Sequence, residues 1–270
     1  MTEHRETIDG IEMRWIEEGA GMPVVLVHGI PTSPELWRYV IPRLHGVRAL
    51  AWEMVGYGES MTEGAGRDIS VAAQAGYLGQ WMQHVGVESA VLVGHDLGGG
   101  VVQILAAKQP RRAAGLVLTN AIGYDSWPIP SVKAMRAVGG LLRHLPSTWL
   151  AASLRAFLAR GHDDSAVASA SADVHLPRYA RSGGAAAFVR QIRSLDVHDT
   201  LAVQDRLKEL SLPAAIVWGE ADRFQKIDYG ERFARDLNAP LDRIAGGKHF
   251  TPEDHPDEVA VGIKRVVSSV

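Results

Sequence analysis

Three side chains in this 270-residue sequence are of types that catalyse hydrolysis, and each follows a short apolar run. Asp96 is the centre of the Gly-x-Asp-x-Gly segment at 94–98, while Asp222 and His249 follow two later apolar runs. Glycine tolerates sharp turns because it has no Cβ to clash. We therefore expect the chain to reverse direction at Asp96 and to project its carboxylate outward from the turn.

Together, these three residue types can carry out a hydrolysis in two steps. Asp96 would attack an sp3 carbon that bears a leaving group and would become an alkyl ester. His249, held by Asp222, would then deprotonate a water that attacks the ester carbonyl. The same carboxylate attacking a carboxylic ester would form an energy-rich anhydride, so ordinary esterase chemistry is not expected. Glu220 is a nearby alternative for the acid.

Two backbone N–H groups are placed to stabilise the charge of the second step. The turn His28-Gly29-Ile30-Pro31 directly follows an apolar run and would present the N–H of Ile30. Leu97, the residue after the nucleophile, would present the other N–H. One such donor is typically worth about 3–4 kcal/mol, so the pair predicts an oxyanion hole.

The apolar runs are the strands that must hold these residues. They lie at 23–27, 47–52, 89–93, 115–119, 213–218 and 241–245. Their near-continuous apolar character is typical of strands buried on both faces of a parallel sheet. Helical patterns at 71–84 and 98–109 alternate with them, and the Asp9-Gly10 pair predicts a hairpin over 5–18. The sequence thus predicts an α/β fold with a mostly parallel, doubly wound sheet.

One connection is too long for a simple crossover between strands. Roughly ninety residues separate the runs near Thr119 and Pro213, and a segment of that length needs structure of its own. Its patterning is mainly helical and it contains Trp127, Trp149 and Tyr179. We predict a helical cap at 122–205 inserted into an α/β core of 1–121 and 206–270.

The order nucleophile, acid, histidine resembles that of the α/β-hydrolase superfamily. Within it, the Gly-His-Asp turn resembles the aspartate-nucleophile branch, the haloalkane dehalogenases and epoxide hydrolases. The segments His28–Ser33 and Gly247–His249 resemble those of haloalkane dehalogenases, and Gly56–Ser60 is similar to a structural turn common to the superfamily. The resemblance implies an α/β-hydrolase fold and a small apolar organic substrate that reacts with water, either an epoxide or a haloalkane.

The residues that would stabilise the leaving group depart from both families. Familiar dehalogenases place a tryptophan after the nucleophile, where this chain has Leu97. Trp127 or Trp149 in the cap are possible substitutes for a halide donor. Epoxide hydrolases use cap tyrosines, for which Tyr124, Tyr179 or His175 are candidates. The substrate pocket is expected to draw on His28, Trp37, Trp127, Tyr124, Tyr179 and His175.

Composition argues against several kinds of partner and site. A net charge of −3 gives no electrostatic attraction for nucleic acid or an anionic membrane. The absence of cysteine excludes disulfides, thiolate nucleophiles and cysteine metal sites. The first residues have no apolar stretch of the kind found in secretory signals, and no apolar run is long enough to span a bilayer. A cytoplasmic location is expected, while the oligomeric state is not indicated.

The cluster Glu253-Asp254-His255 contains metal-ligating residue types, but a helix start explains it more simply. Thr251 would cap the helix, Pro252 would occupy its first turn, and the acids would favour its N-terminal dipole. We expect neither a metal nor a cofactor.

Two interpretations remain beside the main one. The loss of recognisable leaving-group donors would also suit a catalytically silent receptor for small ligands. The third interpretation is an atypical lactonase or C–C hydrolase.

Overall fold

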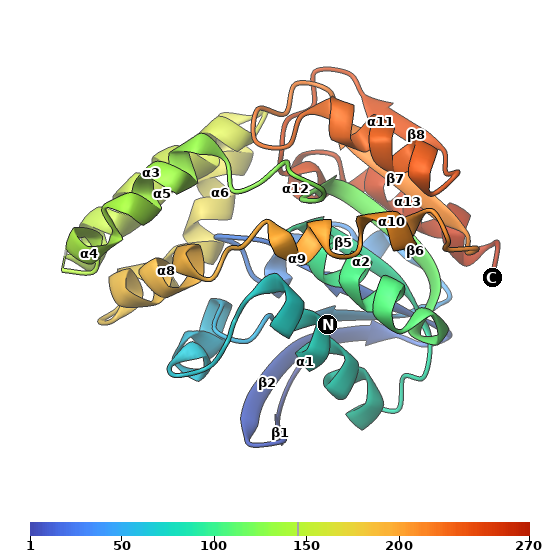
Figure 1. Ribbon diagram of the computed structural model, residues 1–270, viewed down its shortest axis with the longest axis horizontal. Coiled ribbons are helices and arrows are strands. Elements are labelled where there is room, and N and C mark those ends of the chain that lie inside the picture. The colour runs from blue at the N-terminus through green and yellow to red at the C-terminus, as the bar shows by residue number, and fades with distance from the viewer. Residues whose placement is uncertain (145) are drawn as a thin grey trace.

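An eight-stranded sheet forms the centre of the molecule (Figure 1). The computed structural model describes residues 1–144 and 146–270. The strand order is β1-β2-β4-β3-β5-β6-β7-β8, in which β1 and β2, and β2 and β4, pair antiparallel and the later pairs are parallel. The bounds are β1 (Thr2–Ile8), β2 (Ile11–Gly19), β3 (Met22–Val27), β4 (Val47–Trp52), β5 (Ala90–Asp96), β6 (Ala113–Ala121), β7 (Ala214–Gly219) and β8 (Leu241–Ile244).

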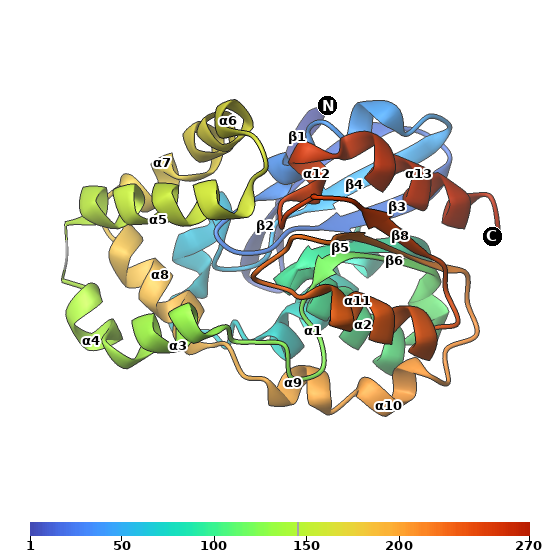
Figure 2. The same ribbon diagram turned by 90° about the horizontal axis from the view of Figure 1, so that it is seen from above.

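Helices cover both faces of the sheet, which is why its central strands are continuous apolar runs. Figure 2 shows α1 (Val71–His84), α2 (Leu97–Lys108) and α11 (Ile227–Asp236) on one face and α13 (Pro256–Val267) on the other. The predicted doubly wound α/β sheet is confirmed. The short helices of the core are η1 (Pro34–Trp37), η2 (Ile41–Arg43), η3 (Gly58–Gly64), η4 (Pro110–Arg112) and α12 (Thr251–Asp254).

The strand that leads to Asp96 is longer than its apolar run. It continues through the polar residues His95 and Asp96, where its register with β6 shifts. Helix α2 begins at Leu97, one residue before the predicted start, so strand and helix join without a loop. The apolar pattern could not show this, because main-chain pairing continues through polar side chains as readily as through apolar ones.

The prediction that Thr251 caps a helix is wrong. Phe250 occupies the N-cap position and Thr251 is the first residue of α12. The Thr251 hydroxyl instead donates to Asn120 Oδ1 at 3.1 Å and lies 2.6 Å from the Thr119 hydroxyl. This threonine therefore ties α12 to the end of β6.

The long connection between β6 and β7 is helical. We call α3–α8 the cap helices: α3 (Pro130–Ala137), α4 (Gly139–Leu142), α5 (Ser147–Gly161), α6 (Ser165–His175), α7 (Pro177–Ala180) and α8 (Gly184–Arg193). They lie together at one side of the sheet (Figures 1 and 2). The next two helices, α9 (His198–Leu201) and α10 (Gln204–Leu207), contact α2 of the core. The boundaries at 122 and 205 remain a prediction.

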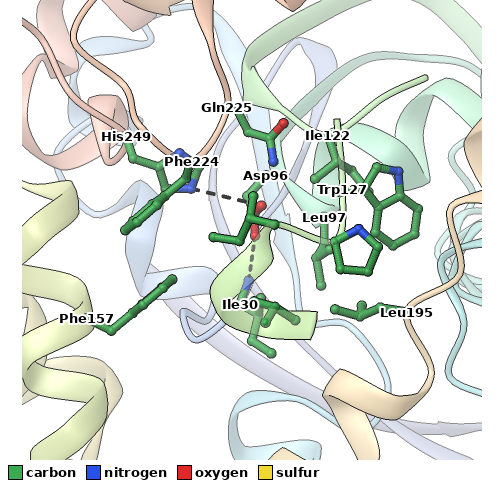
Figure 3. Close-up of a pocket in the computed structure, with 13 residues that line it drawn as sticks. Ile30, Asp96, Leu97, Ile122, Trp127, Phe157, Leu195, Phe224, Gln225 and His249 are labelled. Atoms are coloured by element: carbon green, nitrogen blue, oxygen red, sulfur yellow. Dashed lines mark hydrogen bonds and ion pairs between the residues drawn. The ribbon is translucent and has the colours of Figure 1, made fainter. Parts of the chain in front are cut away.

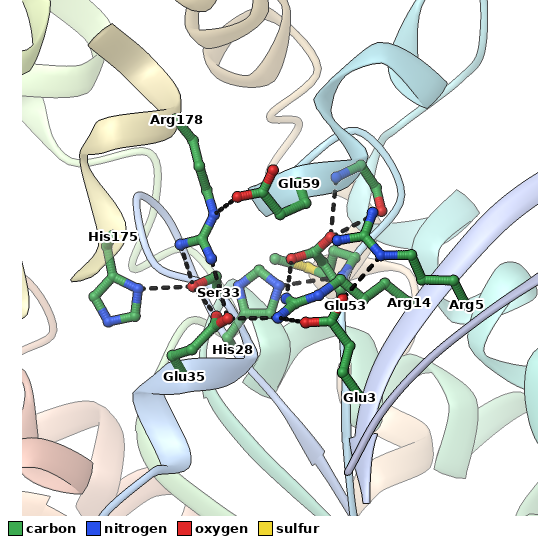
Figure 4. A network of polar contacts seen from close by, with 12 residues as sticks. Glu3, Arg5, Arg14, His28, Ser33, Glu35, Glu53, Glu59, His175 and Arg178 are labelled. Carbon is green, nitrogen blue, oxygen red and sulfur yellow. Dashed lines mark hydrogen bonds and ion pairs between the residues drawn. The ribbon is translucent and has the colours of Figure 1, made fainter. Parts of the chain in front are cut away.

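A buried polar network joins the cap helices to the core (Figure 4). Arg178 of α7 is only 8% exposed. Its guanidinium donates to Glu59 at 2.9 Å, to Glu35 at 3.0 Å and to Ser33 at 3.0 Å. Ser33 and Glu35 lie just before and within η1, and Glu59 lies within η3, so a single cap residue contacts two core segments.

Among the helices of the described ranges, none is long and apolar enough to cross a membrane.

Candidate active site

Asp96 lies at a sharp turn between β5 and α2. Its φ of 49° and ψ of −121° are rare for a residue with a side chain, and such strain persists only where the surroundings impose it. Two glycines allow the close approach around it. A Cβ on Gly98 would lie 2.1 Å from the carbonyl oxygen of Val27, and a Cβ on Gly29 would lie 2.4 Å from Asp96 Oδ2. The turn after β3 can therefore reach the carboxylate.

The structure brings Asp96, Asp222 and His249 together (Figure 3 shows Asp96 and His249). His249 Nδ1 lies 2.8 Å from Asp222 Oδ2 and Nε2 lies 4.0 Å from Asp96 Oδ1. A carboxylate only accepts hydrogen bonds, so Nδ1 is the protonated nitrogen. In the neutral imidazole, Nε2 then carries the lone pair and faces Asp96.

Asn120, at the end of β6, holds the Asp222 carboxylate from another side. Its amide nitrogen donates to Asp222 Oδ2 at 2.7 Å. Its carbonyl oxygen accepts the N–H of Gly219 at 3.2 Å and the Thr251 hydroxyl at 3.1 Å. One buried side chain thereby connects the ends of β6 and β7 with the segment after His249.

The predicted oxyanion donors lie beside Asp96. The N–H of Ile30 donates to Asp96 Oδ2 at 3.1 Å. The N–H of Leu97 also interacts with this carboxyl and lowers its pKa. The two oxygens of Asp96 therefore differ, since Oδ2 is bound by a backbone N–H and Oδ1 is the one nearest His249.

Burial shifts the pKa values of both reacting groups. Burial raises the pKa of Asp96, although His249 and the N–H groups of Ile30 and Leu97 act in the opposite direction. Burial by itself would lower the pKa of His249, but the carboxylates of Asp222 and Asp96 outweigh it and raise that pKa above its ordinary value. Each group is thus more basic than it would be in water.

The carboxylate of Asp96 opens into a small, mainly apolar cavity of about 40 Å³ between the core and the cap helices. A second apolar cavity of about 60 Å³ adjoins it and shares Ile30, Val132, Phe157 and Leu195. The first cavity is lined by Ile30, Asp96, Leu97, Ile122, Trp127, Pro128, Ile129, Val132, Phe157, Leu195, Phe224, Gln225 and His249.

Neither cap tryptophan presents its N–H to this cavity. The ring of Trp127 lines it, but the indole N–H donates to the Thr200 hydroxyl at 2.7 Å. Trp149 is 69% exposed on the outside of α5. Neither tryptophan therefore takes up the possible role of replacing the missing halide donor. The Trp127 N–H is bonded to Thr200, and the Trp149 side chain is exposed.

Five other predicted pocket residues do not line the cavity. Tyr124 donates to Asp236 at 2.9 Å and Tyr179 to Gln191 at 2.9 Å, so both hydroxyls are already used. His175 lies 2.8 Å from the Ser33 hydroxyl (Figure 4). It also lies 3.2 Å from Glu253. The last two, His28 and Trp37, are completely buried in the core.

Sequence reasoning missed several side chains that do line the cavity, among them Phe157, Phe224 and Gln225. Phe157 comes from α5, and its ring stacks at 4.6 Å on that of Phe224. Phe224 in turn packs edge-on against His249, with ring centroids 5.1 Å apart. Gln225 follows it in the loop that also contains Asp222. Only the position of this loop after a strand could have pointed to the last two, and no signal pointed to Phe157.

Among the residues that the structure describes, no group of histidine and acidic side chains is arranged to hold a metal ion.

The turn at Asp96 joins a parallel strand directly to a helix, and enzymes of the α/β-hydrolase class present their nucleophile in this way. A family model described as alpha/beta hydrolase fold matches residues 22–256. The chain belongs to the α/β-hydrolase family, and it is a hydrolase. The resemblance seen in the sequence is confirmed.

Named relatives belong to both expected enzyme groups. Haloalkane dehalogenase 2 of Mycobacterium bovis is 27% identical over 263 residues, which cover 93% of this chain and 90% of that protein. Bifunctional epoxide hydrolase 2 of Sus scrofa is 35% identical over 113 residues, or 41% of this chain and 20% of that protein. The crystal structure of an alpha/beta hydrolase fold protein from Burkholderia ambifaria matches with a TM-score of 0.86 at 25% identity, over 96% of each chain.

Proposed function

We propose that this hydrolase forms an alkyl ester on Asp96 from a haloalkane- or epoxide-type electrophile and then hydrolyses that ester. The observation that supports it most is the different surroundings of the two Asp96 oxygens. Oδ2 accepts the N–H of Ile30 at 3.1 Å, whereas Oδ1 lies 4.0 Å from His249 Nε2, beyond hydrogen-bonding distance. Oδ1 is therefore free to attack, and Oδ2 becomes the carbonyl oxygen of the ester.

In the first step, a C–O bond forms between Asp96 Oδ1 and an sp3 carbon while the bond to the leaving group breaks. The electron pair of the broken bond departs with the leaving group, and Asp96 loses its charge. Burial favours this step, because the buried carboxylate lacks the hydration that would weaken it as a nucleophile.

In the second step, His249 Nε2 takes a proton from a water whose oxygen adds to the ester carbon of Asp96. The negative charge then develops on Oδ2, where the N–H of Ile30 already donates. The N–H of Leu97 interacts with the same carboxyl group. Asp222 stabilises the protonated His249. Collapse breaks the bond between the carboxyl carbon of Asp96 and the alkyl oxygen, and the proton on His249 passes to the departing alcohol. The regenerated Asp96 carboxyl then releases the second proton of the water to solvent.

The named relatives support both electrophile classes. The dehalogenase from Mycobacterium bovis matches nearly the whole of this chain, and the epoxide hydrolase from Sus scrofa matches less than half of it. The longer alignment with the dehalogenase therefore favours a haloalkane substrate. Alignment length does not distinguish the chemistry of the two substrate classes.

The test is to trap the ester. His249→Ala should still be alkylated but should not turn over, so incubation with panels of 1-haloalkanes and epoxides should add the alkyl mass to Asp96. His198→Ala is a matched control, because this histidine is 81% exposed and outside the cavity. It should turn over normally.

Absence of an adduct and of turnover across both panels would contradict the proposal. Tight binding of ligands recovered unchanged, with affinity indifferent to Asp96→Asn, would instead support a receptor.

A further inference from the structure

The cavity contains one polar side chain to which the proposed mechanism gives no role. Gln225 is 2% exposed. Within the described ranges its amide oxygen has no hydrogen-bond partner, although it is buried. A buried amide oxygen without a partner is costly and marks this side chain as one whose contacts are incomplete in the protein alone. Three other lining side chains have polar atoms: Asp96, His249 and Trp127, whose indole N–H already donates to Thr200. The remaining lining side chains are apolar.

The loop that contains Gln225 holds it firmly at the site. Its backbone carbonyl accepts the indole N–H of Trp218 at 2.9 Å. The preceding residue, Phe224, donates its N–H to Asp222 Oδ1 at 2.7 Å. Two hydrogen bonds, one to Trp218 and one to Asp222, thus anchor the segment between Asp222 and α11. Figure 3 shows the amide nitrogen of Gln225 turned toward Asp96.

We propose that the Gln225 carboxamide donates the hydrogen bond that stabilises the leaving group as it departs, and that the natural electrophile is an alkyl halide. The inference rests on the proposed attack by Asp96. When the C–O bond forms and the carbon–halogen bond breaks, the electron pair leaves with the halide and no proton is transferred. An anion in an apolar cavity needs a donor to offset its lost hydration.

The chemistry of an amide distinguishes between the two substrate classes. An amide N–H can donate to an anion but does not release its proton near neutral pH. A halide requires only such a donor. An opening epoxide generates an alkoxide, a strong base that needs an acid to protonate it.

The tyrosine hydroxyls expected to be that acid are directed elsewhere. Tyr124 is bonded to Asp236 and Tyr179 to Gln191. In the part of the chain that the structure describes, no tyrosine lines the cavity. The donor present at the site therefore suits a halide.

The first experiment removes the donor and keeps the volume. In Gln225→Met, alkylation of Asp96 is followed in the His249→Ala background with matched 1-chloro-, 1-bromo- and 1-iodoalkanes. The rate should fall about 10- to 100-fold for chloride, the range expected for losing a hydrogen bond to a charged group, and least for iodide, which needs the least stabilisation. An equal loss for all three halides would show a structural role and overturn the proposal.

The second experiment uses epoxides as substrates. Wild type should alkylate more slowly with a 1,2-epoxyalkane than with the bromide of equal length. Faster alkylation by the epoxide would overturn the assignment to halides. If Gln225→Met slows only hydrolysis of the ester and leaves alkylation unchanged, the amide acts on water and the proposal is wrong.

A binding measurement separates failure of this inference from failure of the proposed function. The Trp127 ring lines the cavity, so its fluorescence should respond to bromide or iodide without any turnover. Wild type should bind halide, Gln225→Met should bind it at least 10-fold more weakly, and Gln225→Glu should not bind it. Halide affinity that is equal in wild type and Gln225→Met would refute the role of Gln225, even if the Asp96 adduct forms.

Discussion

At the scale of single residues, the raised pKa values of Asp96 and His249 make the two proposed steps respond differently to pH. Burial raises the pKa of Asp96 above that of an ordinary aspartate, about 3.9, so protonation removes the proposed nucleophile at a higher pH than for an exposed aspartate. The pKa of His249 is raised above about 6.5, because Asp222 and Asp96 outweigh the effect of burial. His249 accepts a proton only when it is neutral, so lowering the pH should stop hydrolysis before it stops alkylation.

We therefore expect the wild-type ester on Asp96 to accumulate at mildly acidic pH, between the two pKa values, and to disappear as the pH rises. Quenching during turnover followed by mass spectrometry measures it. An ester level that stays constant across this pH window would show that His249 is not the base.

Asn120 is a positioning residue for Asp222. Asn120→Ala removes the 2.7 Å bond to Asp222 Oδ2 and leaves the N–H of Gly219 without its acceptor. Stability should fall by about 1–3 kcal/mol, the usual cost of an unsatisfied buried group. Ester hydrolysis should slow more than alkylation, because Asp222 acts only through His249. Urea unfolding and single-turnover rates check the two parts, and equal slowing of both steps would point to general disruption.

At the scale of elements, the segment that contains His249 is attached to the cap by backbone and charged contacts. The carbonyl of Gly161, at the end of α5, accepts the N–H groups of His249 at 2.9 Å and Phe250 at 3.1 Å. Glu253 of α12 lies 3.3 Å from His162 and 3.2 Å from His175 and also pairs with Arg38. Docking of α5 and α6 therefore holds the segment that contains His249 in place.

His162 makes this attachment dependent on pH. Burial would lower the pKa of His162, but Asp254 and Glu253 raise it to about 9. A group whose pKa is raised on folding stabilises the folded state fully below its unfolded pKa of about 6.5. That stability is lost as the pH rises through about 9. The gap between the two pKa values is worth on the order of 3 kcal/mol.

We expect Tm to decline between these pH values in wild type and to decline less in His162→Gln. Thermal unfolding across the range, with the exposed His198→Gln as control, measures the difference. Identical slopes for His162→Gln and wild type would place the pH dependence elsewhere.

At the scale of the whole molecule, packing of the cap on the core creates the second cavity. Its walls come from the turn after β3 and from α3, α5 and α8, and include Pro31, Met135, Leu154 and Phe188. It adjoins the cavity at Asp96 and offers about 60 Å³ of apolar space. A substrate with a linear hydrocarbon tail can place that tail there while its reactive carbon faces Asp96.

Filling this cavity should change the preferred chain length. Leu154→Phe enlarges a buried wall residue of α5 and should lower kcat/KM for long 1-haloalkanes by about 10-fold, while short ones react as before. Steady-state rates over a homologous series measure the effect. A uniform loss at every length would mean that the variant disturbs the cap instead.

The sequence by itself determined the elements and their order, because both depend on local pattern. Apolar runs marked the strands of the sheet, and glycine spacing marked the turn at Asp96. The order of Asp96, Asp222 and His249 indicated the chemistry, because each reacting residue follows its own strand. The N–H groups of Ile30 and Leu97 could be inferred for the same reason.

Only the tertiary structure decided which side chains surround the nucleophile. Phe157 of α5 and Gln225 of the loop before α11 are far apart in the chain, and they meet at the cavity through packing between the cap and the core. The directions of the Trp127 indole and the Tyr124 hydroxyl were equally beyond the sequence, since each is set by a distant hydrogen-bond partner. Local pattern therefore indicates the proposed nucleophile, and three-dimensional packing determines which side chains surround it.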